Sequence, residues 1–132
     1  MPKKITAAVV QVGGSASEAR IRQHRVLVDR PEAGGGSDQG PMGGELFLAA
    51  VGGCFMSNLL AAAKPRGASI SDAQVELVGT LIEGPMRYES ITMRVSAACE
   101  PDLLATLVEI ADRGCIMTNT LRGVLPVTVR IG

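Results

Sequence analysis

Two cysteines, Cys54 and Cys115, are the residues of this sequence whose chemistry could extend beyond packing. The reactive form of cysteine is the thiolate, which forms most readily beside a cation or at the N-terminal end of a helix. Cys115 follows Gly114 and opens a short stretch of helical character, so free backbone N–H groups should surround its sulfur. Cys54 lies within an apolar helix and needs a cation from elsewhere in the fold or from a second copy of the chain. The candidate cations lie early in the sequence, at Arg20, Arg22 and Arg25.

The third cysteine and the single histidine carry weaker signals. Cys99 ends a predicted strand with no base nearby, which favours a structural thiol. His24 has no third group to orient a Cys-His pair, so it does not discriminate among functions. With no CxxC pair and one histidine, the sequence favours neither a zinc site nor a secreted disulfide framework. It predicts a cytoplasmic protein without a metal.

Residues 43–64 are predicted to form a long central helix around which the other elements pack. Ala, Leu, Met and Phe dominate, and no run of β-branched residues interrupts them. The helix is apolar almost all round, which is typical of burial on most faces, and its small residues would let a second copy of the chain approach closely. Its length would also suit a membrane span. Glu45, Ser57, Asn58 and the lack of flanking basic or aromatic belts favour a core helix and no membrane contact.

Composition narrows the class of protein further. The 132 residues fit a single domain, 1–132. Thirteen basic and thirteen acidic residues cancel, and no basic stripe with aromatic residues is present, which argues against nucleic acid as a partner. Only three residues are aromatic, so a core of smaller aliphatic side chains favours an extended apolar interface between subunits.

The remaining pattern predicts an α+β fold. Strands are expected at 4–12, 18–29, 70–83, 86–99 and 124–131, and helices at 101–113 and 115–121. The simplest arrangement is one antiparallel sheet covered on one face by the long central helix and a shorter helical pair. Six glycines and two prolines exclude regular structure from residues 30–44. Because no GxxxxGK[ST] or GxGxxG pattern occurs there, the segment is interpreted as a loop that wraps the helix start or a neighbouring subunit, rather than as a phosphate site.

Two segments at a specific separation resemble one known family over nearly the whole chain. VLVDRPEAGGGSDQGPMGGELFLAAVGGC, ending at Cys54, and CIMTNTLRGVLPVTVRI, starting at Cys115, are similar to the two cysteine motifs of the osmotically inducible protein C / organic hydroperoxide resistance (OsmC/Ohr) family. The resemblance implies an OsmC-like fold in an intertwined homodimer, with two active sites at the subunit interface. It also implies thiol-dependent reduction of organic hydroperoxides, with an external dithiol as reductant and no cofactor. Cys54 would be the peroxidatic thiolate and Cys115 the resolving thiol.

The resemblance also suggests supporting roles. An apolar wall would surround the substrate tail, formed by Phe47, Val51, Phe55 and Met117, with Leu48, Met56 and Leu121 nearby. Family members with strong peroxidase activity carry an arginine in the first hairpin turn. That turn here is Gly13-Gly14-Ser15, so the role falls to Arg20 or Arg22.

Two further positions depart from the family pattern. The family glutamate ten residues before the first cysteine is replaced by Gly44, and Glu45 stands nine before it. Nine residues at about 100° each place Glu45 on the opposite side of the helix from Cys54, where it would cap the helix or bind an arginine. Ile116 stands where a proline commonly follows the second cysteine.

Two functional hypotheses follow. The first is a thiol peroxidase, which predicts a Cys54–Cys115 disulfide after treatment with an alkyl hydroperoxide. The second is a non-enzymatic protein of the same fold that binds a hydrophobic or electrophilic small molecule in the dimer cleft. It predicts an ordinary Cys54 thiol and no hydroperoxide consumption.

Overall fold

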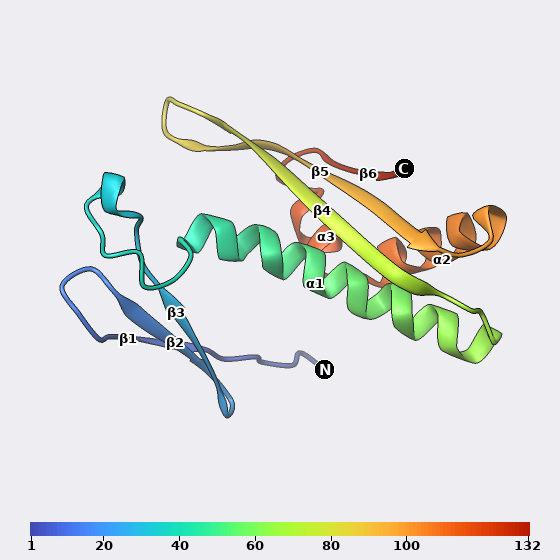
Figure 1. Ribbon diagram of the computed structural model, residues 1–132, viewed down its shortest axis with the longest axis horizontal. Coiled ribbons are helices and arrows are strands. Elements are labelled where there is room, and N and C mark those ends of the chain that lie inside the picture. Colours follow the sequence, from blue (N-terminus) through green and yellow to red (C-terminus); the bar gives the residue numbers. More distant parts are fainter. The chain divides into compact units, whose positions relative to one another are not determined.

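The computed structural model describes residues 1–132, the whole chain, as two compact units, Met1–Phe47 and Leu48–Gly132 (Figure 1). The first unit contains a three-stranded antiparallel sheet in the order β1-β2-β3. Its strands are β1 (Ala8–Gln11), β2 (Ser17–Ile21) and β3 (His24–Val28).

The single returning strand predicted over 18–29 is wrong, because this segment forms two strands and a tight turn. Ile21 pairs with His24, and the chain reverses between them at Arg22, which has a positive φ of 54°. Left-handed backbone at a non-glycine residue is uncommon. The sequence has neither Gly nor Asn at this turn. The alternating strand pattern therefore continues across residues 18–29 with no residue that indicates a turn.

The glycine-rich loop after β3 contains a short 3₁₀ helix, η1 (Glu32–Gly34). A Cβ atom at Gly36 or Gly40 would collide with the backbone carbonyls of Arg30 or Leu27. These two glycines therefore allow close approach of two backbone segments, a structural reason for the composition that needs no bound phosphate.

Asp29 organises the same loop. Its carboxylate accepts hydrogen bonds from the backbone N–H groups of Arg30 (2.7 Å), Ser37 (3.2 Å) and Gln39 (3.1 Å), and the side chain is almost fully buried. The Ser15 hydroxyl lowers the pKa of Asp29 most, burial opposes it, and the three N–H groups lower it further. The loop is thus closed around an ionised carboxylate.

Helix α1 (Gly43–Ala63) confirms the predicted central helix, and the 3₁₀ turn η2 (Lys64–Arg66) follows it. One side is buried through Val51, Phe55 and Leu59. The expectation of burial on most faces is not met within one chain. A stripe of mostly small residues stays exposed, at Ala50, Gly53, Ser57, Leu60 and Ala61.

The second unit contains the other sheet, in the order β4-β5-β6. Strands β4 (Ser71–Ile82) and β5 (Arg87–Ala98) form the predicted antiparallel pair. Strand β6 (Val127–Ile131) pairs parallel to β5. The single antiparallel sheet is therefore corrected to two sheets, one of them mixed. The parallel pairing follows from the helical crossover between β5 and β6, because such a connection returns the chain to the end of the sheet from which β5 began.

The crossover consists of α2 (Pro101–Gly114) and α3 (Ile116–Leu121), the predicted helical pair. The core of this unit draws on α1, α2, the corner before α3 and the central strand, with buried side chains at Val51, Phe55, Leu59, Ile91, Met93, Val95, Leu104, Leu107, Ala111 and Cys115. The other face of the sheet is polar apart from Val78, and Glu76 and Arg94 form a 3.7 Å ion pair there. The core thus lies between this sheet and the three helices.

Length and composition alone would let Gly43–Arg66 cross a membrane. However, Val51, Phe55 and Leu59 are fully buried, which is the packing of a core helix.

Candidate active site

Helix α1 carries Cys54 at the boundary between its buried and exposed sides. The next residue, Phe55, is fully buried, whereas Gly53 before it is exposed. Cys54 itself is half-buried, and its sulfur is free. The helix therefore holds this thiol at the edge of the core, where a small molecule can reach it.

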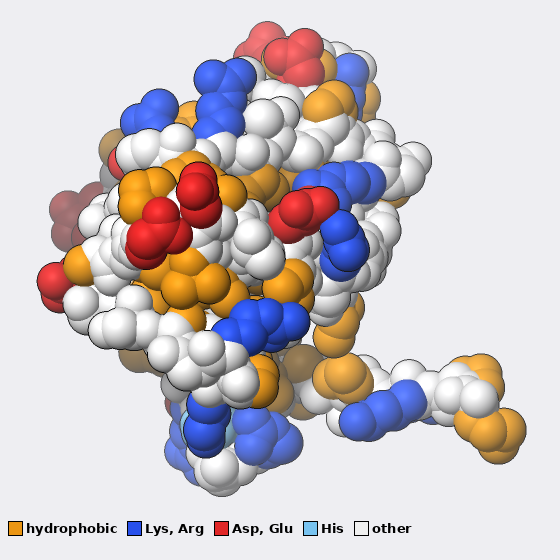
Figure 2. Space-filling view, turned by 90° about the vertical axis from the view of Figure 1, so that its right-hand side faces the viewer, with side chains coloured by type: hydrophobic (Ala, Val, Ile, Leu, Met, Phe, Trp, Pro, Cys, Tyr) orange, Lys and Arg blue, Asp and Glu red, His pale blue; other side chains and the backbone are white.

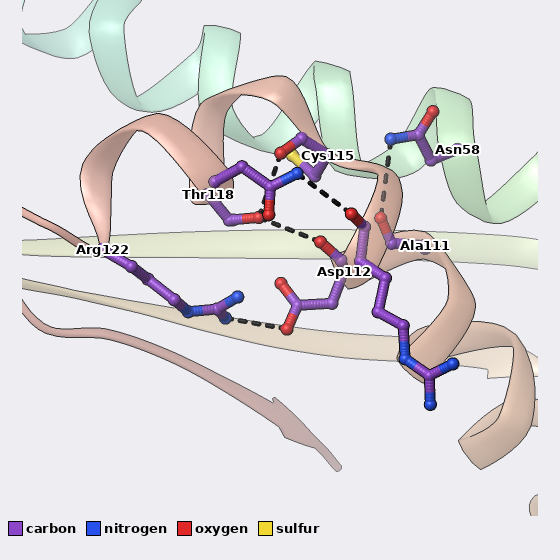
Figure 3. A network of polar contacts seen from close by, with 8 residues as sticks. Asn58, Ala111, Asp112, Cys115, Thr118 and Arg122 are labelled. Carbon is purple, nitrogen blue, oxygen red and sulfur yellow. Dashed lines mark hydrogen bonds and ion pairs between the residues drawn. The ribbon is translucent and has the colours of Figure 1, made fainter.

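Cys115 lies at the corner where α2 ends and α3 begins (Figure 3). Its backbone is extended, its N–H donates to the Asp112 carbonyl at 3.2 Å, and its carbonyl accepts from the Asn119 N–H at 3.0 Å. The side chain has no exposed surface. The corner thus directs Cys115 into the core.

The structure brings the two sulfurs together. The Cys115 thiol lies close enough to the Cys54 sulfur to lower its pKa, although the residues are 61 positions apart, one in α1 and the other at the corner between α2 and α3. Neither is in a disulfide, so the structure is that of the reduced pair.

Hydrogen bonds lower the pKa of the Cys54 thiol. Burial alone raises this pKa, but donation from the Met117 N–H, the Cys115 thiol and the Ile116 N–H outweighs it. The two N–H groups belong to the first turn of α3, where backbone donors lack partners within the helix. The donors expected to act on Cys115 therefore act on Cys54. The sequence predicts these N–H groups correctly but places them around the other sulfur.

Two of the charged residues predicted to assist, Arg20 and Glu45, have local partners. The Arg20 Nε lies 2.8 Å from Glu18 Oε1 on the same strand. The carboxylate of Glu45 accepts the Met42 N–H at 2.8 Å, so it caps the start of α1, as the helical geometry suggested. The groups that lower the Cys54 pKa are all neutral donors.

Of the residues expected to contact a substrate tail, Val51 and Phe55 lie in the core without exposed surface. Phe47 and Met117 are half-buried. An apolar cavity of about 240 Å³ opens between α1 and β4, on the side of α1 away from Cys54, lined by Ala49, Gly52, Gly53, Met56, Val75 and Leu77. Of these six, only Met56 was considered as a substrate contact from the sequence, because glycine and alanine give no hint of the space that they leave.

A polar network around Cys115 was also missed (Figure 3). The Asn58 side-chain amide, one helical turn after Cys54, points to the Ala111 carbonyl at 3.5 Å. Thr118, which is fully buried, donates to the Asp112 carbonyl at 3.2 Å, and Arg122 forms an ion pair with the Asp112 carboxylate. Polar side chains near a cysteine motif are the available signal, but Asn58 and Thr118 bind backbone carbonyls, which the sequence does not reveal.

Comparison with solved structures supports the architecture. An OsmC-like protein from Mycoplasma pneumoniae is 18% identical, with a TM-score of 0.84 over 100% of this chain and 98% of that one. An organic hydroperoxide resistance protein OsmC from Legionella pneumophila is 18% identical, with a TM-score of 0.76 over 99% of both chains. The organic hydroperoxide resistance protein OhrB of Bacillus subtilis is 23% identical, with a TM-score of 0.71 over 97% of this chain and 98% of that one. These likenesses show the α+β fold.

Sequence comparison identifies the family. None of the curated protein sequences matches the chain. A family profile described as OsmC-like protein matches residues 35–130, which include both cysteines of the pair and most of the chain. The chain therefore belongs to the OsmC-like family.

Proposed function

We propose that this protein is a thiol peroxidase that reduces organic hydroperoxides. Structural neighbours that are organic hydroperoxide resistance proteins support a role in stress defence. The observation that carries the finer proposal is the Cys54 sulfur itself, which lies beside the buried Cys115 thiol and has a lowered pKa. A thiolate with a second thiol in reach is the arrangement needed for a peroxidatic and a resolving cysteine.

In the first step, the Cys54 thiolate attacks the distal oxygen of the hydroperoxide. The O–O bond breaks, the alkoxide takes up a proton and leaves as the alcohol, and Cys54 becomes a sulfenic acid. The Ile116 and Met117 N–H groups hold the negative charge on the sulfur before the attack. The thiolate fraction at neutral pH therefore depends on the position of α3.

In the second step, the Cys115 sulfur attacks the Cys54 sulfur. A disulfide forms, and the sulfenic hydroxyl leaves with a proton as water. An external dithiol then reduces the bond to two thiols and is itself oxidised to a disulfide. The burial of Cys115 leaves the Cys54 sulfur as the accessible end of the bond, so the reductant attacks there.

The surroundings favour an apolar substrate. The two residues whose N–H groups face Cys54, Ile116 and Met117, carry apolar side chains with exposed surface, which suits the tail of an alkyl or acyl hydroperoxide. Hydrogen peroxide has no such tail and gains nothing from this surface.

We further propose that the protein is a homodimer. The exposed stripe on α1 consists of small and apolar residues, and further apolar side chains reach the surface between charged groups in Figure 2. Such a surface is typical of an interface between subunits. Light scattering should give twice the 13.7 kDa chain mass. Leu60→Glu, which places a charge on the stripe, should give the monomer, whereas the exposed change Glu109→Gln should not.

The peroxidase proposal is tested on the purified protein with dithiothreitol and cumene hydroperoxide. Catalytic consumption of the hydroperoxide, with a Cys54–Cys115 disulfide seen by mass spectrometry after one equivalent, is the expected result. Iodoacetamide should alkylate Cys54 with a midpoint pH below that of N-acetylcysteine, because hydrogen bonds lower its pKa. An ordinary midpoint and no consumption with any thiol donor would favour the alternative, a non-enzymatic binder of small molecules.

A further inference from the structure

One ion pair closes the corner that carries Cys115. The Arg122 Nη2 lies 2.8 Å from the Asp112 Oδ2, and both side chains are partly shielded, with 39% and 24% of their surface exposed. Asp112 belongs to the last turn of α2, and Arg122 follows the last residue of α3. The pair therefore joins the two ends of the segment that contains the resolving cysteine (Figure 3).

Asp112 is also the backbone anchor of this corner. Its carbonyl accepts both the Cys115 N–H and the Thr118 hydroxyl, each at 3.2 Å. The Thr118 hydroxyl lies 3.4 Å from the Cys115 carbonyl as well, so its one proton is shared between two acceptors. Any shift of Asp112 is thus transmitted to the start of α3.

Helix α3 cannot hold its own position. It has six residues, and isolated helices below about 12 residues are marginal in water. Its placement must come from contacts with the α2 side of the corner: the Asp112–Arg122 pair, the Thr118 hydroxyl, and the Asn119 amide, which donates to the Arg113 carbonyl at 2.9 Å. Of these contacts, only the ion pair involves Arg122, the residue that follows α3.

We propose that the Asp112–Arg122 ion pair positions α3, so that the Ile116 and Met117 N–H groups stay directed at the Cys54 sulfur. The inference rests on the proposed peroxidase function for its purpose, but its geometry concerns the thiol alone. Neither side chain is among the groups that bind the sulfur, so both are positioning residues.

The partners of Asp112 explain why Arg122 matters. The Asp112 Oδ1 is buried without a hydrogen-bond partner, and Oδ2 is held by Arg122. Removing the guanidinium would leave a partly buried carboxylate with no cation, which favours movement of the corner toward water. The neighbouring pair Arg113–Glu109 is mostly exposed, at 74% and 67%, and its loss should not matter in this way.

The test compares Arg122→Met, Arg122→Lys and Arg113→Met in a Cys99→Ser background. Ultraviolet thiolate absorbance and iodoacetamide alkylation of Cys54 are followed against pH. Arg122→Met should raise the midpoint and slow alkylation at neutral pH about threefold to tenfold, since one pKa unit changes the thiolate fraction up to tenfold. Arg122→Lys should recover part of the loss, and Arg113→Met should match the parent.

An unchanged midpoint in folded Arg122→Met would overturn the inference, as would an equal shift in Arg113→Met. If Arg122→Met does not fold, the same two measurements are made on Asp112→Asn. This substitution keeps the volume of the Asp112 side chain and removes its charge. These readouts concern ionisation alone, so they remain decisive even if the parent protein reduces no hydroperoxide.

Discussion

Replacement of Cys54 with serine should abolish hydroperoxide reduction, leaving only the rate of the solution without protein. A serine hydroxyl is not ionised near neutral pH and does not attack the O–O bond, so the first step has no nucleophile. The measurement is loss of cumene hydroperoxide with dithiothreitol as reductant, at protein concentrations that give fast turnover for the parent. The effect should be complete, because Cys115 is buried and cannot replace Cys54.

Cys99→Ser is the matched control for this experiment. Cys99 is also a half-buried free thiol, but it lies at the end of β5 and outside the pair. Full activity in Cys99→Ser, together with none in Cys54→Ser, assigns the reaction to one sulfur. Residual turnover in Cys54→Ser would contradict the proposed role of Cys54.

The elements of the second unit could be predicted from the sequence because each has a strong local pattern. The apolar run of α1, the alternation of β4 and β5 and the Pro101 start of α2 all appear at the expected places. The direction of β6 could not be predicted in this way. Parallel pairing depends on the path of the chain through α2 and α3, which no periodicity in the strand encodes.

The first unit was less predictable, for a conformational reason. The reversal at Arg22 uses a positive φ without glycine or asparagine, so the composition gives no turn signal. The buried Asp29 was likewise treated as one more strand residue. Its importance depends on three N–H groups that meet its carboxylate only after the loop has closed.

In the candidate site, too, some features follow from sequence motifs and others depend on the folded chain. The two cysteines could be paired because both family motifs are visible in the sequence. The source of the lowered Cys54 pKa could not be predicted, because the sequence shows arginine side chains but not the direction of backbone donors. The groups that lower it here are backbone N–H groups and a thiol. The residue types in a sequence do not show which backbone N–H groups face a given side chain. That direction depends here on the position of α3 in the fold.

Replacement of Cys115 with serine should separate the two chemical steps. Cys54 should still reduce about one equivalent of hydroperoxide, but no disulfide can form and the sulfenic acid should persist. It should then react with dimedone, and excess hydroperoxide should convert it to the irreversible sulfinic acid. Mass spectrometry after one and after ten equivalents follows both products. A parent-like resistance to over-oxidation would show that Cys115 is not the resolving thiol.

Comparison of Cys115→Ser with Cys115→Ala tests a second role of the same residue. In the reduced protein the Cys115 thiol is one of three donors that lower the Cys54 pKa. Serine retains an O–H donor at this position, whereas alanine retains none. The first oxidation at neutral pH should therefore be slower in Cys115→Ala, with the alkylation midpoint moved to higher pH, and close to the parent rate in Cys115→Ser. Equal midpoints in the two variants would mean that the α3 N–H groups alone hold the thiolate, and that Cys115 acts only after Cys54 has been oxidised.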